Sequence, residues 1–198
     1  FWWDDTAPSA DLVVANDADV FTLDPQRMSW LQDFRVCYAL FEGLVRWDNQ
    51  DMSIAPAAAD LPEVSEDRLT YTFHIRPDAR WSNGDPVTAH DFVYAGKRLI
   101  FPDTASDYTN LFFAIDGAQD FFRWRNNQCA EFAKHNGDQS AEELFEEADR
   151  QFEKTVAITA VDDRTLRIKL RRPTAYFLDL LCLGVFFPVH RPCVEGWP

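Results

Sequence analysis

Residues 69–94 read LTYTFHIRPDARWSNGDPVTAHDFVY and are the most strongly patterned part of the chain. Apolar and polar residues alternate from 69 to 76, with the apolar set at the odd positions, which predicts a strand with one buried face. The run at 82–86 predicts a turn, since Ser, Asn, Gly, Asp and Pro favour turn geometry. Thr88 and Asp91 have the spacing of a capping box. The stretch therefore predicts a half-buried strand connected through turns to a helix.

Before this stretch, the sequence predicts extended structure and then a helix. Residues 11–24 combine a β-rich run, a polar turn and an alternating pattern, which predicts a strand, a turn and an extended segment. We expect a helix to begin at Ser29, because Gln32 follows three residues later as in a capping box, and to end at Gly43. The apolar residues of this helix recur at helical spacing and predict one buried stripe, formed by Leu31, Phe34, Tyr38 and Phe41.

The remaining predicted elements are, in chain order, a strand at 44–47, an Ala- and Pro-rich connector at 54–62, a helix at 116–134, a break at Gly137-Asp138, a helix capped by Ser140 and Glu143, strands at 156–161 and 165–170, and a helix at 175–183. Segregated strands and helices favour a mixed fold, α/β or α+β, over an alternating barrel. The last thirty residues look like a chain that enters a domain. We expect Leu178, Leu181, Phe186 and Phe187 to need partners that the preceding elements do not supply.

The composition of the chain argues against some functions. Its 198 residues include 19 Lys and Arg against 33 Asp and Glu, which gives a formal net charge of -14. A surface this negative repels phosphate groups, so no nucleic-acid partner is predicted and anionic membrane surfaces are disfavoured. No run approaches the roughly 18 to 20 apolar residues of a membrane helix. No signal peptide is visible, although processing could have removed one.

The chemically reactive residues form no recognisable catalytic or metal motif. Nucleophile-elbow, Walker, dinucleotide and zinc-protease signatures are absent, and the four histidines lack ligand spacing, so neither a metal nor a cofactor is predicted. Trp30 lies at a predicted helix start, where free amides and an aromatic face could receive a ligand, or where it could serve as a hydrophobic staple. The cysteines leave both a disulfide and free buried thiols open: Cys37, Cys129, Cys182 and Cys193.

Several segments together resemble one family. These are LDP at 23–25, LFEGL at 40–44, YTFHIR at 71–76 and ARWSNGDPVTAHDFVY at 79–94. In order and spacing they resemble the extracellular solute-binding proteins of family 5, the oligopeptide-, dipeptide- and nickel-binding receptors of ABC importers. The family usually carries a tryptophan shortly before the strand, where this chain has Leu61-Pro62-Glu63-Val64, and residues from about 121 to 154 look like an insertion.

The resemblance implies a type II periplasmic-binding fold whose two lobes close on a ligand. Family members are longer, so the chain is expected to be an N-terminal fragment that lacks the second lobe. Residues 1–43 are expected to be the N-terminal part of lobe I, residues 44–170 a small inserted α/β domain, and residues 171–198 the return segment into lobe I. Motif alignment places ligand contacts on Ser29, Trp30, Leu31 and Tyr108.

The resemblance also implies a function without catalysis. The expected protein is a receptor for an oligopeptide or dipeptide that delivers its ligand to an ABC permease in the membrane. It is expected to be periplasmic or extracytoplasmic, either free or lipid-anchored. Within the same family, the ligand could instead be a metal chelate, haem or an oligosaccharide. From other classes, a hydrolase domain using dispersed Asp and His residues and an interaction protein using the aromatic insertion remain alternatives.

Overall fold

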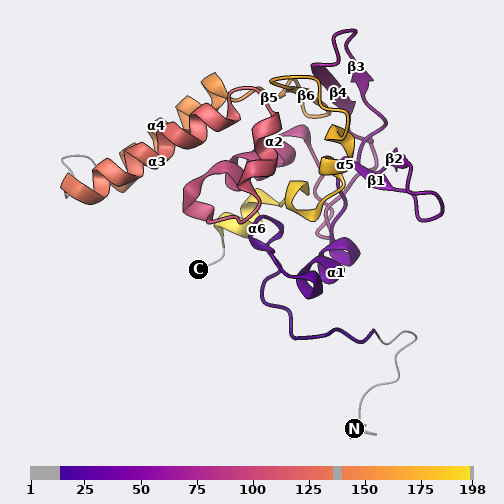
Figure 1. Ribbon diagram of the computed structural model, residues 1–198. Coiled ribbons are helices and arrows are strands. Elements are labelled where there is room, and N and C mark those ends of the chain that lie inside the picture. The colour runs from indigo at the N-terminus through magenta and orange to yellow at the C-terminus, as the bar shows by residue number, and fades with distance from the viewer. Residues whose placement is uncertain (1–13, 136–139, 197–198) are drawn as a thin grey trace, which may run out of the picture.

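The computed structural model describes residues 14–135 and 140–196, and its larger sheet is antiparallel and four-stranded, in the order β3-β4-β6-β5 (Figure 1). The predicted alternation at 69–76 is confirmed, because Tyr71, Phe73 and Ile75 are buried. A second sheet pairs β1 with β2. The strands are β1 Val45–Trp47, β2 Ile54–Pro56, β3 Glu63–Val64, β4 Thr70–His74, β5 Ile158–Ala160 and β6 Thr165–Lys169.

Helices cover the sheet and extend away from it, so the prediction of a mixed fold is confirmed. The α-helices are α1 Leu31–Leu40, α2 Ala89–Ile100, α3 Ala118–His135, α4 Ala141–Thr155, α5 Phe177–Leu181 and α6 Arg191–Glu195. Among the described residues, four short 3-10 helices lie before or between the α-helices: η1 Pro25–Arg27, η2 Pro102–Thr104, η3 Thr109–Ala114 and η4 Gly184–Phe186.

Helix α2 packs against strands β5 and β6 and begins as the sequence predicts. The backbone N–H of Thr88 donates to the Asp91 carboxylate over 2.7 Å, which forms one half of the capping box. Gly96 lets this helix approach η3, since a Cβ there would lie 2.8 Å from the Phe112 ring. The helix thus closes the main hydrophobic core over the sheet.

Helices α3 and α4 run side by side and project away from the sheet as an arm (Figure 1). The predicted cap of α4 is confirmed, because the Ser140 hydroxyl accepts from the Glu143 N–H over 3.1 Å. Arg125 is buried between the helices and donates to the Leu144 carbonyl over 3.1 Å. The predicted break at Gly137-Asp138 lies outside the described residues.

Helix α1 differs from the sequence prediction in both its cap and its buried face. Trp30, not Ser29, is its N-cap residue, and no side chain caps the helix. The predicted buried stripe is wrong for Leu31 and Tyr38, which are 60% and 46% exposed while Asp33 and Cys37 are fully buried. The other two members, Phe34 and Phe41, are partly buried against the core. Long-range contacts rotate the helix, since the Asp33 carboxylate accepts from the Phe21 N–H over 2.8 Å. The outward-facing apolar residues of α1 are therefore available to a ligand.

Two further local predictions are wrong, and a third is tested only in part. Of the strand, turn and extended segment predicted at 11–24, the first residues lie outside the described part, 17–18 form a bend within the predicted turn, and 14–24 contain no strand. The connector at 54–62 contains β2, whose Ala55 pairs with Arg46 of β1. Gly43 is not a helix cap, because α1 ends at Leu40. Its small size instead admits the Phe187 ring, which would lie 2.5 Å from a Cβ at that position.

The segment from 171 to 196 packs on the rest of the described chain, contrary to the expectation that its apolar residues would need other partners. Leu181 and Phe187 are buried, and Leu178 and Phe186 are partly buried against the main core. Gly184 lies against Cys37 and Phe34, so η4 packs directly on α1. The N-terminal and C-terminal parts of the described chain thus share one interface.

All four cysteines are free thiols in the structure, and two of them, Cys37 and Cys182, are buried. Burial raises the pKa of the Cys37 and Cys182 thiols from the ordinary value of 9.0 to about 12. Because both thiols hold their protons more tightly in the folded chain, the stability they contribute is present below pH 9 and is lost as the pH rises toward about 12.

We therefore expect the urea midpoint to fall between pH 9 and 11, and to fall less in a Cys37→Ala/Cys182→Ala variant. Unfolding curves at intervals of half a pH unit test this. Tyr94, whose pKa burial also raises, titrates equally in both proteins and cancels in the comparison. Tyr38 interacts electrostatically with both thiols, so the two proteins are compared in a Tyr38→Phe background. Parallel pH profiles for the two proteins would contradict the assignment.

Candidate functional site

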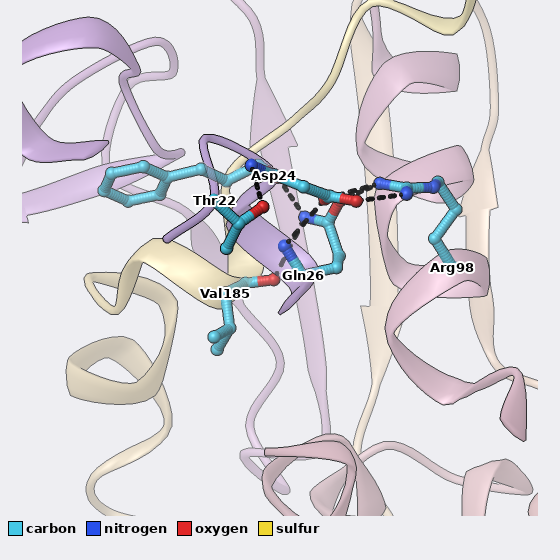
Figure 2. Close-up of polar contacts among 6 residues, drawn as sticks. Thr22, Asp24, Gln26, Arg98 and Val185 are labelled. Atoms are coloured by element: carbon cyan, nitrogen blue, oxygen red, sulfur yellow. Dashed lines mark hydrogen bonds and ion pairs between the residues drawn. The ribbon is translucent and has the colours of Figure 1, made fainter. Parts of the chain in front are cut away.

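The segment that precedes α1 is fixed by a buried polar network (Figure 2). The Asp24 carboxylate accepts two hydrogen bonds from the Arg98 guanidinium of α2, over 2.6 and 2.9 Å. Arg98 also donates to the Gln26 amide oxygen over 2.6 Å. These contacts join the LDP segment to a helix that follows it by more than sixty residues in the sequence.

Gln26 carries the network on to the C-terminal segment. Its side chain is fully buried, and its Nε2 donates to the carbonyl oxygens of Val185 and Phe187 over 3.2 and 3.0 Å. The backbone N–H of Gln26 donates to Asp24, which caps η1. Both polar atoms of the Gln26 side chain and its backbone N–H therefore have partners. The network therefore anchors the backbone directly before residues 28–31 to α2 and to the C-terminal segment.

Ser29 and Tyr108, which are distant in the sequence, lie in one region of the fold. The Ser29 hydroxyl donates to the carboxylate of Asp107, the residue before Tyr108. The Tyr108 ring contacts Phe34 of α1 edge to face, with ring centroids 5.8 Å apart. The contact fixes the ring of Tyr108, which is partly buried at the start of η3.

Trp30 and Leu31 project from the start of α1 beside this contact. Trp30 is 61% exposed, and Phe34 follows it by one helical turn. Tyr38 continues the same side of the helix, with its ring 6.4 Å from that of Phe34. We call this region the α1 surface, and its residues are Ser29, Trp30, Leu31, Phe34, Tyr38, Asp107 and Tyr108. It brings together all four residues that the sequence singled out.

The α1 surface offers apolar contact area and hydrogen-bonding groups. Burial raises the pKa of the Tyr38 hydroxyl, while a hydrogen bond with the Gly184 backbone acts in the opposite direction. The phenol therefore stays neutral at physiological pH. Within residues 14–135 and 140–196, no group of three or more His, Cys, Asp or Glu side chains is arranged to hold a metal ion.

Two grooves lie outside the α1 surface. One, of about 710 Å³, runs between the end of α1 and the turn at Trp81, and is lined in part by Leu40, Glu42 and Arg76. The other, of about 520 Å³, is lined in part by Arg171 and Tyr176. None of the four predicted residues is among the residues that line these two grooves. No helix in the described part is long and apolar enough to cross a bilayer.

Comparison with known proteins shows the family. The model of the middle region of bacterial extracellular solute-binding proteins, family 5, matches residues 53–195. The chain belongs to this family. It is 43% identical over 111 residues to the periplasmic oligopeptide-binding protein OppA of Haemophilus influenzae, covering 55% of this chain and 20% of that protein. It is 34% identical over 175 residues to the periplasmic murein peptide-binding protein MppA of Escherichia coli, covering 88% and 28%.

Solved structures agree with the sequence comparison. Listeria monocytogenes OppA bound to peptide superimposes with a TM-score of 0.74 and 33% identity, covering 91% of this chain and 31% of that one. The unliganded open form of the murein tripeptide-binding protein MppA gives a TM-score of 0.71 and 32% identity. These are type II periplasmic-binding proteins, so the expected fold is confirmed. The chain spans less than a third of the length of these relatives.

Sequence reasoning missed the residues that support the α1 surface. Asp107 and Phe34 position Ser29 and Tyr108, and Arg98 anchors the segment before the helix. Asp24 could have been singled out, because it belongs to the LDP motif of the resemblance. Nothing in the sequence pairs it with Arg98, which reads as an ordinary surface residue near the end of a helix.

Proposed function

We propose that the chain is part of a receptor that binds peptides outside the cytoplasm and delivers them to an ABC permease. The observation that carries this proposal is the α1 surface, where apolar side chains face outward from a firmly anchored helix. Extended peptides are recognised through backbone hydrogen bonds, with pockets for side chains. The names of the relatives support the ligand class, since both the Haemophilus OppA and the Escherichia MppA are named for peptide binding in the periplasm.

Ligand binding would act through closure of two lobes and not through chemistry. In this proposal, residues 1–43 and 171–198 belong to lobe I, residues 44–170 form the small inserted domain, and a second lobe covers the α1 surface when ligand is present. A ligand that contacts both lobes shifts the equilibrium from open to closed, which is the state the permease would recognise. The anchoring network keeps the lobe I half of the site rigid during closure.

Substitutions at the α1 surface should weaken peptide binding in the full-length protein. We expect Trp30→Ala to raise the Kd for a bound peptide roughly tenfold. The substitution removes the indole, which is exposed without ligand and would be covered by a bound peptide. Isothermal titration calorimetry with defined tri- to pentapeptides measures the effect. Phe132→Ala is the matched control, since this partly exposed aromatic residue lies on the arm and should leave Kd unchanged.

Tyr108 allows the roles of ring and hydroxyl to be separated. We expect Tyr108→Ala to weaken binding as much as Trp30→Ala, because Phe34 loses its packing partner as well. Tyr108→Phe keeps the ring and should cost about fivefold in Kd, the loss of one hydrogen bond. Unchanged affinity in both Trp30→Ala and Tyr108→Ala would refute the site, whereas native mass spectrometry that finds a bound non-peptide would refute the ligand class.

A further inference from the structure

Three reactive side chains from two distant segments form a hydrogen-bonded line on the described surface. The Nε2 atom of His190 lies 2.9 Å from the Asp85 carboxylate, and its Nδ1 atom lies 3.0 Å from the Cys193 sulfur. Asp85 belongs to the turn between β4 and α2, whereas the other two belong to the start of α6. None of the three belongs to the α1 surface.

The order of the three groups fixes the tautomer of the imidazole. A carboxylate only accepts hydrogen bonds, so Nε2 must carry a proton and donate it to Asp85. In the neutral ring, Nδ1 is then left as an acceptor that faces the Cys193 thiol. Because the two ring nitrogens point in opposite directions, the three groups do not converge on one point as metal ligands do. The arrangement is that of a nucleophile, a base and a residue that orients the base.

The base is held rigidly while the thiol remains accessible. The His190 side chain is 13% exposed, and its ring packs on Trp81 with centroids 5.6 Å apart. Cys193 is exposed, and its backbone N–H donates to the His190 carbonyl over 3.0 Å at the start of α6. This backbone bond keeps the thiol and the imidazole on the same turn. A small molecule in solvent can therefore reach the sulfur without any movement of the base.

The other cysteines lack such a partner in the structure. Cys37 and Cys182 are buried, and burial raises the pKa of both thiols to about 12. Burial also raises the pKa of Cys129, an effect that nearby Arg125 partly opposes. Thiolates and not thiols are the nucleophiles in cysteine chemistry, so these three should react slowly at neutral pH. They provide internal references for Cys193.

We propose that Cys193 is a nucleophilic thiol that undergoes exchange with low-molecular-weight disulfides, with His190 as its base and Asp85 as the positioning residue. His190 Nδ1 accepts the proton of Cys193, and the resulting thiolate attacks one sulfur of the disulfide. The bond between the two small-molecule sulfurs breaks as the new disulfide to Cys193 forms. The departing thiolate takes the proton from His190 and leaves as a small thiol. Cys193 is thereby oxidised, and the departing sulfur of the disulfide is reduced.

The test compares the reaction of each cysteine with 4,4′-dithiodipyridine, an uncharged disulfide, in the natural full-length chain. Samples quenched over time are digested, and mass spectrometry of the peptides gives a rate for each site. We expect Cys193 in the folded protein at pH 7 to react about tenfold faster than Cys193 in the urea-unfolded protein. An exposed cysteine without such a base reacts at a similar rate in both states, whereas the buried Cys37 and Cys182 react faster after unfolding. A folded rate no higher than the unfolded rate would overturn the proposal.

Variants assign the roles within the line. His190→Ala should lower the folded rate of Cys193 about tenfold, and an unchanged rate would overturn the role of the base. Asp85→Asn should lower the rate less, and Asp85→Glu should restore it, because the glutamate again accepts from Nε2. A merely structural role of Asp85 predicts equal rates in both variants. If His190→Ala does not fold, the comparison of folded and unfolded wild-type protein decides alone. Peptide affinity is measured in parallel and reports separately on the α1 surface.

Discussion

Replacing Arg98 with methionine is expected to lower the free energy of unfolding by about 3 kcal/mol. The variant keeps the aliphatic part of the side chain but leaves the Asp24 carboxylate and the Gln26 amide without their shared donor. Both side chains of the ion pair are largely buried, at 16% and 25% exposure. The cost is therefore that of an uncompensated buried charge and not that of a surface ion pair.

Urea unfolding followed by tryptophan fluorescence measures the change. Arg164→Met is the matched control, because this arginine lies in the exposed turn between β5 and β6 and should shift stability by no more than about 0.5 kcal/mol. In the double variant Arg98→Met/Asp24→Asn, part of the lost stability should return, since the stranded charge is gone. Equal loss in the single and double variants would show that the ion pair does not anchor the segment.

Replacing Gly117 with alanine is expected to cost at least about 3 kcal/mol. Gly117 has a φ of 76°, and a Cβ there would lie 1.8 Å from the Thr155 carbonyl oxygen. The obstacle is backbone, so no side chain can move aside. The backbone N–H of Asp116 donates to Lys169 of β6 and its carbonyl accepts from Ala157, just before β5, so a shift of this turn would also break these two hydrogen bonds.

Gly84 provides a control, because its φ is also positive but a Cβ at that position would meet no neighbouring atom. Its φ is 93°, and no atom lies within 4 Å of a Cβ at that position. Gly84→Ala should therefore cost only about 1 kcal/mol, the conformational preference alone. Thermal and urea unfolding of the two variants measure the difference. Similar losses at Gly84 and Gly117 would mean that the turn at Gly117 relaxes without penalty.

Local sequence signals predicted the elements whose causes are local. The alternation in β4, the capping boxes of α2 and α4 and the strands β5 and β6 all depend on residues within a few positions of one another. The resemblance to family 5 is confirmed as well, because four spaced motifs together are far more specific than any one of them. The roles of Ser29, Trp30, Leu31 and Tyr108 in ligand binding stay predictions.

Long-range contacts account for the errors. Periodicity predicted an apolar buried face for α1, but a buried carboxylate, Asp33, holds the N-terminal segment and turns that face outward. Ser29 had the spacing of a cap, yet its hydroxyl bonds to Asp107, which no local pattern could indicate. The line of Asp85, His190 and Cys193 also joins distant segments, so the scattered histidines gave no signal for it.

The pairing of β4 with β6 also governs how the chain can fold. Residues 70–74 pair with residues 165–169, and both the α3–α4 arm and α2 lie between them in the sequence. Helices can form early from neighbouring residues, whereas closing so long a loop is slow, as it is for other folds rich in distant contacts. The apolar face of β4 therefore stays exposed until residues 165–169 have been synthesised and can pair with it. During that interval, Tyr71, Phe73 and Ile75 of the emerging chain are open to contact with chaperones or with other chains.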